Sequence, residues 1–405
     1  MKQLTIVILL IYGVITAVSA QDEGIRFEKP EWIRVVRKAS KEKKLIFVDC
    51  YTFWCGPCRE LSKNIFPQKV VGDFYNQHFV SVKVDMDKDA MAGVLKKKFT
   101  PAAYPTLLFI DAQSGDIVHM VVGGGDAGRI LEVGRQALDR DNNLSGLIRQ
   151  YQAGERGAAF MKDYLKALLA AYQKEEHAAV LDAYLASLPD DRLVEKENWE
   201  IFKENVRDPL VPAFRRVMDN REKIYRFEDR AEADKTLGRI IDNGVRSITE
   251  PSPYALLTGE KVDEARNQTL VEYLQSVDFG VCPAALAKLF TAEYSRKGDY
   301  KAMWNSIQAA YRYNVFRGME DYSYIWNHIP ALAKGADDPE ILQSAAALMD
   351  RLNREGKPLY YRIALMNGKT ALLEKKGDRT GAEEAKALAK KYREEEDKKY
   401  KEEKK

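Results

Sequence analysis

The pattern of apolar and polar residues changes in character near residue 143. Before that point, short apolar runs alternate with segments in which apolar residues recur every three or four positions. Beyond it, almost only the second pattern remains. A period near 3.6 is typical of helices, and short continuous apolar runs are typical of strands buried on both faces. The sequence therefore predicts an α/β region followed by a mostly α-helical region.

The α/β region, residues 21–143, is expected to alternate strands with helices. Apolar runs predict strands at 45–48, 79–84, 106–110 and 117–122. Helical spacing is found at 31–43, 55–76 and 127–138. Pro67 is expected to kink or divide the second helix, because proline lacks the N–H of an interior helical hydrogen bond.

The helical region, residues 144–389, carries apolar stripes on single helix faces. These stripes lie at 164–172, 180–188, 286–294, 341–352 and 360–373. Gly298-Asp299 and Gly377-Asp378 have the order of a helix C-cap followed by an N-cap. This pattern of helices and caps resembles tetratricopeptide repeats, but the sequence shows no fixed repeat length. Irregular packing of helices is therefore the alternative. The charged tail, residues 390–405, is expected to be a solvated helix end that frays.

The first twenty residues have the pattern of a secretory signal peptide. Lys2 precedes an apolar run at 4–15, and Val18-Ser19-Ala20 forms a small-residue cleavage signal. The run is short for a membrane span, which needs about 20 residues; an uncleaved anchor remains the alternative. We therefore expect residues 1–20 to be removed after Ala20 and the protein to be periplasmic or otherwise extracytoplasmic.

The net charge and the cysteines limit which classes of function the chain can have. The net charge is +3, with basic and acidic residues interleaved, which gives no case for a nucleic-acid partner. Four cysteines in 405 residues do not make a disulfide scaffold. Two of them, Cys55 and Cys58, lie three positions apart, which points to redox chemistry or a metal. A structural zinc site needs four ligands, and the four histidines are scattered, so we expect neither a metal nor a cofactor.

The segment Val48–Cys58 (VDCYTFWCGPC) resembles the active-site segment of thioredoxin, and Tyr104-Pro105-Thr106 resembles its cis-proline loop. Residues 64–87 are similar to the thioredoxin domains of bacterial envelope disulfide-exchange proteins. The resemblance covers roughly residues 25–140. It implies a thioredoxin fold and a thiol–disulfide oxidoreductase that works through Cys55 and Cys58.

Physical chemistry gives the two cysteines different tasks. Disulfide exchange needs a thiolate, and a free cysteine has a pKa of about 8.5. Cys55 is expected at a helix N-terminus, where the N–H groups and the dipole favour negative charge and make it the attacking sulfur. Cys58 lies one turn later and can attack the mixed disulfide. Gly56 allows the tight turn, and Pro57 suits the first helical turn.

Asp49 ends an apolar strand, where desolvation should raise its pKa and make it a proton acceptor for Cys58. The resemblance implies the same role. An aspartate that only caps or solvates the strand end is the alternative. In the family a lysine on the neighbouring strand often accompanies this aspartate. Alignment places Ser81 at that position, with Lys83 two residues further on.

The expected substrate-binding residues surround the cysteines. The resemblance implies a cis bond before Pro105, which would leave the backbone of Tyr104 free to pair with a substrate peptide. Trp54 is expected to be a surface contact beside Cys55, with ordinary packing as the alternative. Gly56 and Pro57 complete this set.

The remaining cysteines are expected to be unreactive. Cys50 falls on a buried strand, where a free cysteine behaves as a small hydrophobe, and a regulatory thiol is the alternative. Cys282 starts a helix and is expected to be an inert or partly buried thiol.

The Gly-Pro dipeptide between the cysteines resembles reducing members of the family, whose potential in thioredoxin is about −270 mV. We therefore expect a reductase that acts on disulfides or thiols of envelope proteins, with an electron donor in the membrane. A disulfide isomerase or chaperone whose helical domain binds clients is one alternative. A non-catalytic helical interaction protein that uses the thioredoxin fold as a scaffold is another. The substrate, the partner of the helical domain and the oligomeric state are not fixed by the sequence.

Overall fold

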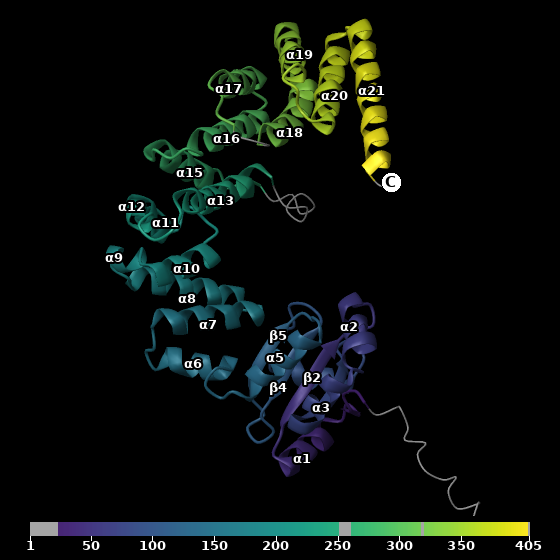
Figure 1. Ribbon diagram of the computed structural model, residues 1–405, viewed down its shortest axis with the longest axis vertical. Coiled ribbons are helices and arrows are strands. Elements are labelled where there is room, and N and C mark those ends of the chain that lie inside the picture. Colours follow the sequence, from purple (N-terminus) through teal and green to yellow (C-terminus); the bar gives the residue numbers. More distant parts are fainter. Residues whose placement is uncertain (1–22, 251–260, 317–319, 404–405) are drawn as a thin grey trace, which may run out of the picture. The chain divides into compact units, whose positions relative to one another are not determined.

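The computed structural model describes residues 23–250, 261–316 and 320–403 (Figure 1). The chain divides into two compact units, one ending at Pro189 and one beginning at Asp190. The expected signal peptide, residues 1–20, lies outside the described residues. Within the described ranges, every helix is too short or too polar to cross a membrane.

The first unit contains a five-stranded sheet in the order β1-β3-β2-β4-β5. Its strands are β1 Phe27–Glu28, β2 Leu45–Tyr51, β3 Phe79–Asp85, β4 Thr106–Ile110 and β5 Ile117–Val122. β3 runs parallel to both β1 and β2, whereas β4 is antiparallel to β2 and β5. The helices before residue 143 are α1 Trp32–Glu42, α2 Gly56–Glu60, the π-helical turn η1 Leu61–Ile65, α3 Lys69–His78, α4 Ala90–Leu95 and α5 Ala127–Leu138.

The central strands are apolar on both faces because helices cover both sides of the sheet. One face packs on α1 and α4, and the other on η1, α3 and α5. Phe47 lies at the centre of the second core, with five aromatic rings at centroid distances between 4.8 and 6.5 Å. Such tilted and edge-on ring pairs add to the free energy of burial. The core therefore fixes β2, the strand that leads to the cysteines.

Most of the predicted elements of this unit are confirmed. β4, β5 and α5 have the expected limits, and the helix expected at 55–76 divides around Pro67. The predictions missed β1 and α4. The α/β fold followed by a largely helical region is confirmed, whereas the repeat architecture stays a prediction.

Three further helices belong to the first unit: α6 Leu144–Gln152, α7 Ala158–Ala170 and α8 Lys174–Ser187. α6 and α7 pack against β5. The buried His119 of β5 accepts a hydrogen bond at Nδ1 from the backbone N–H of Leu144, at 3.2 Å. Burial lowers the pKa of His119 to about 4, so the ring is neutral and can accept. The sequence boundary at residue 143 stays a prediction, and the compact units meet at 189/190.

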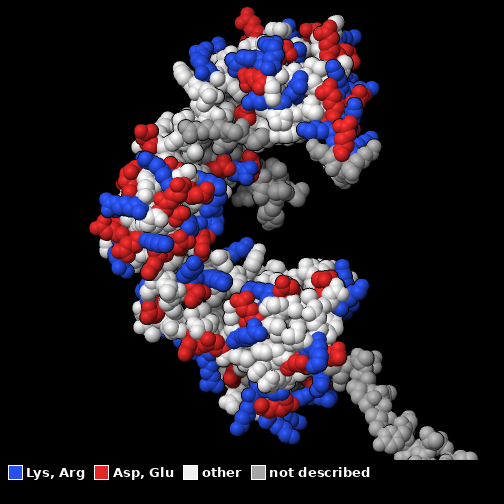
Figure 2. All heavy atoms as spheres, viewed as in Figure 1, with Lys and Arg blue, Asp and Glu red and all other residues white. Residues whose placement is uncertain are grey.

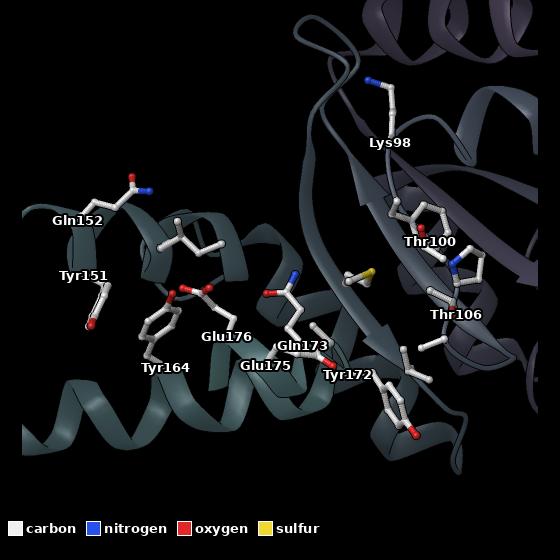
Figure 3. Close-up of a pocket in the computed structure, with 17 residues that line it drawn as sticks. Lys98, Thr100, Thr106, Tyr151, Gln152, Tyr164, Tyr172, Gln173, Glu175 and Glu176 are labelled. Carbon is white, nitrogen blue, oxygen red and sulfur yellow. The ribbon is translucent and has the colours of Figure 1, made fainter. Parts of the chain in front are cut away.

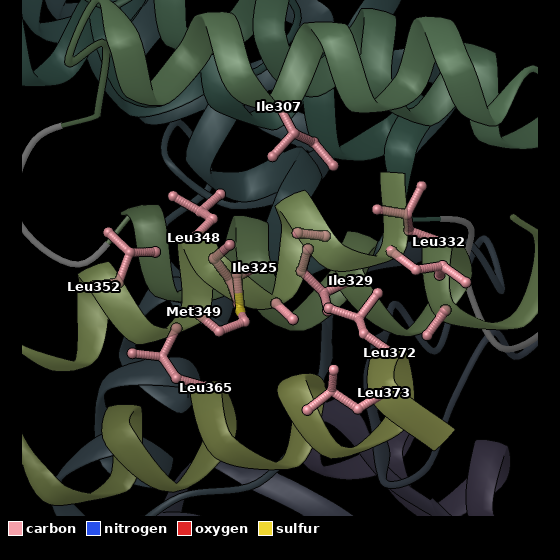
Figure 4. Close-up of a cluster of buried hydrophobic side chains, with 14 of the residues drawn as sticks. Ile307, Ile325, Ile329, Leu332, Leu348, Met349, Leu352, Leu365, Leu372 and Leu373 are labelled. Atoms are coloured by element: carbon pink, nitrogen blue, oxygen red, sulfur yellow. The ribbon is translucent and has the colours of Figure 1, made fainter. Parts of the chain in front are cut away.

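Every described element of the second unit is a helix. They are α9 Asp190–Leu193, α10 Lys196–Asn205, α11 Pro212–Asp219, α12 Arg221–Ile224, α13 Arg230–Thr249, α15 Glu264–Ser276, α16 Cys282–Lys297, α17 Tyr300–Arg312, α18 Glu320–Gly335, α19 Pro339–Asn353, α20 Leu359–Lys376 and α21 Arg379–Glu403. α21 carries the charged tail as a continuous helix. Leucine, isoleucine and methionine side chains of α17 to α20 interlock between the helices (Figure 4).

Both expected cap pairs are confirmed in this unit. Gly298 and Gly377 have φ angles of 70° and 86°, the left-handed conformation that ends a helix. Asp299 then accepts a hydrogen bond from the N–H of Ala302, and Asp378 from that of Gly381. Basic and acidic side chains are interspersed over the face shown in Figure 2.

Replacing Phe47 with alanine should weaken the sheet. We expect Phe47→Ala to lower the opening free energy of β2 and β4 amides by about 3–5 kcal/mol, because a large cavity replaces the ring. Native-state hydrogen exchange measures this locally, which a chain with two units requires. Phe53→Ala is the control, since the Phe53 side chain is 62% exposed and its loss should change the value by less than about 0.5 kcal/mol. Equal effects of the two variants would contradict the assignment of the core.

Candidate active site

Cys55 and Cys58 form a disulfide at the start of α2. Cys55 is the N-cap residue, and its Sγ accepts a hydrogen bond of 3.1 Å from the backbone N–H of Cys58. The sulfur takes the place of the oxygen that usually caps a helix. The same N–H and the helix dipole stabilise a thiolate at Cys55 once the disulfide is reduced. Only 4% of Cys55 and 2% of Cys58 are exposed to solvent. A substrate therefore reaches the Cys55 sulfur over a small exposed area.

Asp49 is fully buried on β2 and faces Lys83 of the adjacent strand. The β2–β3 register pairs Asp49 with Lys83 and Ser81 with Phe47. The alignment that placed Ser81 beside Asp49 is therefore wrong, because it missed the register by two residues. Lys83 Nζ lies 3.5 Å from Asp49 Oδ2, while neither carboxylate oxygen accepts a hydrogen bond among the described residues.

The surroundings of Asp49 favour its protonated form. Burial raises the pKa of Asp49 to about 6, and the positive charge of Lys83 opposes the rise. A carboxyl group with such a pKa can exchange a proton close to neutral pH. The predicted desolvation of Asp49 is thus confirmed, whereas its catalytic role is a matter for the proposal below.

Ser62 connects Lys83 to the helix of the cysteines. Lys83 Nζ donates a hydrogen bond to Ser62 Oγ, and Ser62 Oγ donates to the carbonyl of Cys58 at 3.0 Å. Ser62 lies in the π-helical turn η1, and such turns are frequent at functional sites. Sequence reasoning missed Ser62, because a serine four residues after a cysteine carries no signal without the strand register.

The bond between Tyr104 and Pro105 is cis, as the resemblance implied. Gly123, with a φ of 97°, donates its N–H to the Pro105 carbonyl at 2.8 Å and fixes the loop. The backbone of Tyr104 makes no hydrogen bond within the described ranges. It is therefore available to pair with an extended peptide.

Two aromatic side chains are exposed next to the cysteines. Trp54 and Phe53 are 59% and 62% exposed, so Trp54 is a surface residue. The Trp54 ring meets the Tyr104 ring edge-on at 5.9 Å, and its Nε1 donates to Asp87 Oδ2 at 3.2 Å. The contact joins two of the expected substrate-binding residues, while Asp87 carried no signal in the sequence.

The two remaining cysteines are buried and free. Burial raises the pKa of Cys50 above its usual range and that of Cys282 to about 11. Both therefore stay protonated and unreactive near neutral pH, as expected. In the part of the chain that the structure describes, no three histidine, cysteine or acidic side chains group to hold a metal ion.

Comparisons with known proteins cover the same region. The family model "Thioredoxin" matches residues 25–133. Thioredoxin H3 of Arabidopsis thaliana is 33% identical over 95 residues, which span 23% of this chain and 71% of that protein. The thiol:disulfide interchange protein DsbD of Pseudoalteromonas atlantica is 32% identical over 87 residues, 21% of this chain and 14% of that protein. A solved structure of a proposed disulphide-isomerase from Bacteroides thetaiotaomicron is 42% identical, covers 29% of this chain and 97% of its own, and has a TM-score of 0.27.

Asp49→Asn should stabilise the oxidised protein in a pH-dependent way. The pKa of Asp49 is about 6 in the folded state against 3.8 without perturbation, so the folded state holds this proton more tightly. Its contribution to stability is complete below about pH 4 and is lost as the pH rises through about 6. Each pKa unit is worth about 1.36 kcal/mol, so the variant should gain about 3 kcal/mol at pH 8.

Hydrogen exchange of β2 and β3 amides at pH 4 and pH 8 tests this expectation after correction for intrinsic exchange rates. Lys83→Gln is the matched variant, because it removes the charge that lowers the pKa of Asp49 and should move the transition above pH 6. The same gain in Asp49→Asn at both pH values would show that the carboxyl group does not titrate as described.

Proposed function

The chain belongs to the thioredoxin family and is a thiol–disulfide oxidoreductase, and we propose that it reduces disulfides of other proteins in the cell envelope. The observation that carries the proposal is the pair Cys55 and Cys58 at the start of α2, beside a cis-proline and a buried carboxyl group. These parts supply an activated thiolate, a surface for the substrate and a proton acceptor.

In the first step, the Cys55 thiolate attacks one sulfur of the substrate disulfide. A bond forms between Cys55 and that sulfur, the substrate S–S bond breaks, and the other substrate sulfur leaves as a thiolate that takes a proton from solvent. The substrate strand pairs with the free backbone of Tyr104, while Trp54 and the turn at Gly56 and Pro57 contact it from the other side.

In the second step, Asp49 accepts the proton of Cys58. The Cys58 thiolate attacks Cys55 Sγ, the bond between Cys55 and the substrate sulfur breaks as the Cys55–Cys58 disulfide forms, and this second substrate sulfur leaves as a thiolate that takes a proton from solvent. Two electrons have then passed from the dithiol to the substrate. Lys83 and Ser62 position this proton transfer, because Lys83 lies beside the carboxylate and Ser62 ties it to the Cys58 carbonyl.

The sequence supports the proposed direction and compartment. Gly56-Pro57 is the dipeptide of reducing members of the family, and residues 1–20 have the features of a signal peptide. A reductase in an oxidising compartment needs electrons from elsewhere, so a thiol carrier in the membrane is its expected donor. The relative named DsbD is a thiol:disulfide interchange protein, so part of this chain resembles a protein that itself exchanges disulfides.

Cys58→Ser should trap the substrate. Without the resolving thiol, the mixed disulfide between Cys55 and the substrate cannot collapse, so covalent adducts accumulate in the cell. Non-reducing electrophoresis and mass spectrometry identify them, and Cys55→Ser is the control that forms none. A Cys55–Cys58 potential near about −270 mV supports a reductase, whereas a value near about −120 mV would make the protein an oxidase. Efficient refolding of a scrambled substrate would instead favour the isomerase.

Export predicts a defined N-terminus. When the full chain is expressed in a bacterium with an envelope, the mature protein should begin at Gln21 and fractionate outside the cytoplasm. Intact-mass spectrometry of the recovered protein measures the cleavage. If the protein stays in the cytoplasm and keeps residues 1–20, the proposed location in the cell envelope is wrong. The proposed redox chemistry would not be affected.

A further inference from the structure

A cavity of about 800 Å³ lies within the first unit, beside the cis-proline loop (Figure 3). One wall is the segment 98–102, which leads to Tyr104, together with Thr106, the residue after Pro105. Side chains of β5 continue this wall, and residues of α6, α7 and α8 form the opposite one. We call this cavity the α6–α8 groove. It is continuous in sequence with the loop that receives the substrate.

The groove contains a polar group without a partner. Tyr164 of α7 is only 2% exposed overall, yet its phenolic oxygen, without a hydrogen bond to a described residue, is open to water in the groove. Figure 3 shows this hydroxyl directed into the groove, on the side of Glu176. A typical hydrogen bond to such a hydroxyl contributes a net of about 0.5–1.5 kcal/mol, which an occupant of the groove can gain. The groove therefore has a polar position prepared for an occupant.

Two carboxylates and one guanidinium lie at one end of the groove. The Arg156 guanidinium stacks on the Tyr151 ring, 3.6 Å from the ring centroid. Its charge acts on the Tyr164 phenol against that of Glu176. Glu175 and Glu176, in the first turn of α8, form no ion pair or side-chain hydrogen bond among the described residues. Burial and the charge of Glu176 both raise the pKa of the Tyr164 phenol, which places that carboxylate near the hydroxyl. Lys98 lies at the other end of the groove (Figure 3). A positively charged group of an occupant would pair with the carboxylate that Arg156 leaves uncompensated.

Aromatic side chains line both ends of the groove: Tyr151 stands beside Tyr164, whereas Tyr172 lies on the side of Thr106 (Figure 3). Tyr151 of α6 and Tyr172 after α7 both border the groove. Tyr172 has a φ of 60°, a left-handed conformation that a bulky residue adopts at a cost. It is 41% exposed, and Lys174 Nζ donates to its hydroxyl at 2.9 Å. The conformation holds a ring at the mouth of the groove, where glycine would be the less strained residue.

We propose that the α6–α8 groove binds an extended segment of the substrate chain next to its disulfide, with a lysine or arginine of that segment at Glu175 and Glu176 and an aromatic side chain against Tyr172. The inference rests on the proposed function and adds a substrate class to it. A strand paired with Tyr104 continues past residues 100–102 into the groove. Cationic side chains bind well between carboxylates and tyrosine rings. The helices of the first unit thus select substrates rather than take part in the chemistry.

Two synthetic peptide disulfides with the same ring test the selection. One carries arginine and phenylalanine on both sides of the ring, and the other carries glutamate and serine. The wild-type protein should reduce the first with a KM about 10-fold lower, since one charge-assisted hydrogen bond is worth about 1.5–3 kcal/mol. The variant Glu175→Gln/Glu176→Gln should lose this preference, and Tyr164→Phe should weaken it, in each case with kcat unchanged.

Asp182→Asn is the matched control, because it removes a carboxylate from the same helix α8 outside the groove and should keep the preference. Reduction of hydroxyethyl disulfide and the Cys55–Cys58 potential should be equal in all four proteins. Failure of the wild type to reduce hydroxyethyl disulfide would refute the proposed function. The proposed substrate binding in the groove would be wrong in either of two cases. One is normal reduction of hydroxyethyl disulfide without a preference for the basic peptide, and the other is a preference that survives in Glu175→Gln/Glu176→Gln.

Binding without chemistry gives a second measurement. The basic peptide with serines in place of its cysteines should bind the wild-type protein in titration calorimetry and bind Glu175→Gln/Glu176→Gln about 10-fold more weakly. If the peptide does not bind and sedimentation shows a dimer that the same substitutions dissociate, the occupant is a second copy of the chain and the proposal is wrong.

Discussion

Strand β2 is buried on both faces and hydrogen-bonded along both edges, and this constraint places every reactive group of the site. The strand carries Asp49 into the interior and delivers the chain to Cys55 four residues after it ends. Its neighbour β3 brings Lys83 opposite Asp49, and its other neighbour β4 begins directly after the cis bond at Pro105. The aromatic core around Phe47 holds the same strand from one face of the sheet. The chemistry therefore depends on packing that lies outside the site.

Much of this arrangement could be predicted from the sequence, because the informative signals are local. Apolar runs identify β4 and β5 to the residue, and the Cys-Gly-Pro-Cys spacing identifies the helix start. β1 has only two residues, too few for any period to emerge, and α4 is a short helix between polar loops. The position of Lys83 depends on strand register, which a sequence pattern without its partner cannot fix. The α6–α8 groove arises only when helices and sheet come together.

The position of the third cysteine is a second consequence of β2. Cys50 is adjacent in sequence to Asp49, but it points to the core on the α1 and α4 face. Its raised pKa keeps the thiol protonated, and its burial keeps it away from disulfides in solution. Three cysteines in nine residues could otherwise rearrange among themselves during turnover. The strand leaves the oxidised protein with one internal disulfide among the described residues.

Both borders of the sheet are protected against unwanted pairing. Edge strands carry backbone N–H and C=O groups without a partner strand and can therefore start aggregation. Proteins often shorten such strands or cover them. β1 is short, and α6 and α7 lie against β5. A fragment that stopped at the last residue of the thioredoxin match, 133, would uncover β5 and strip His119 of its bond to Leu144. The helices that follow the redox module thus complete the packing of β5, the last strand of its sheet.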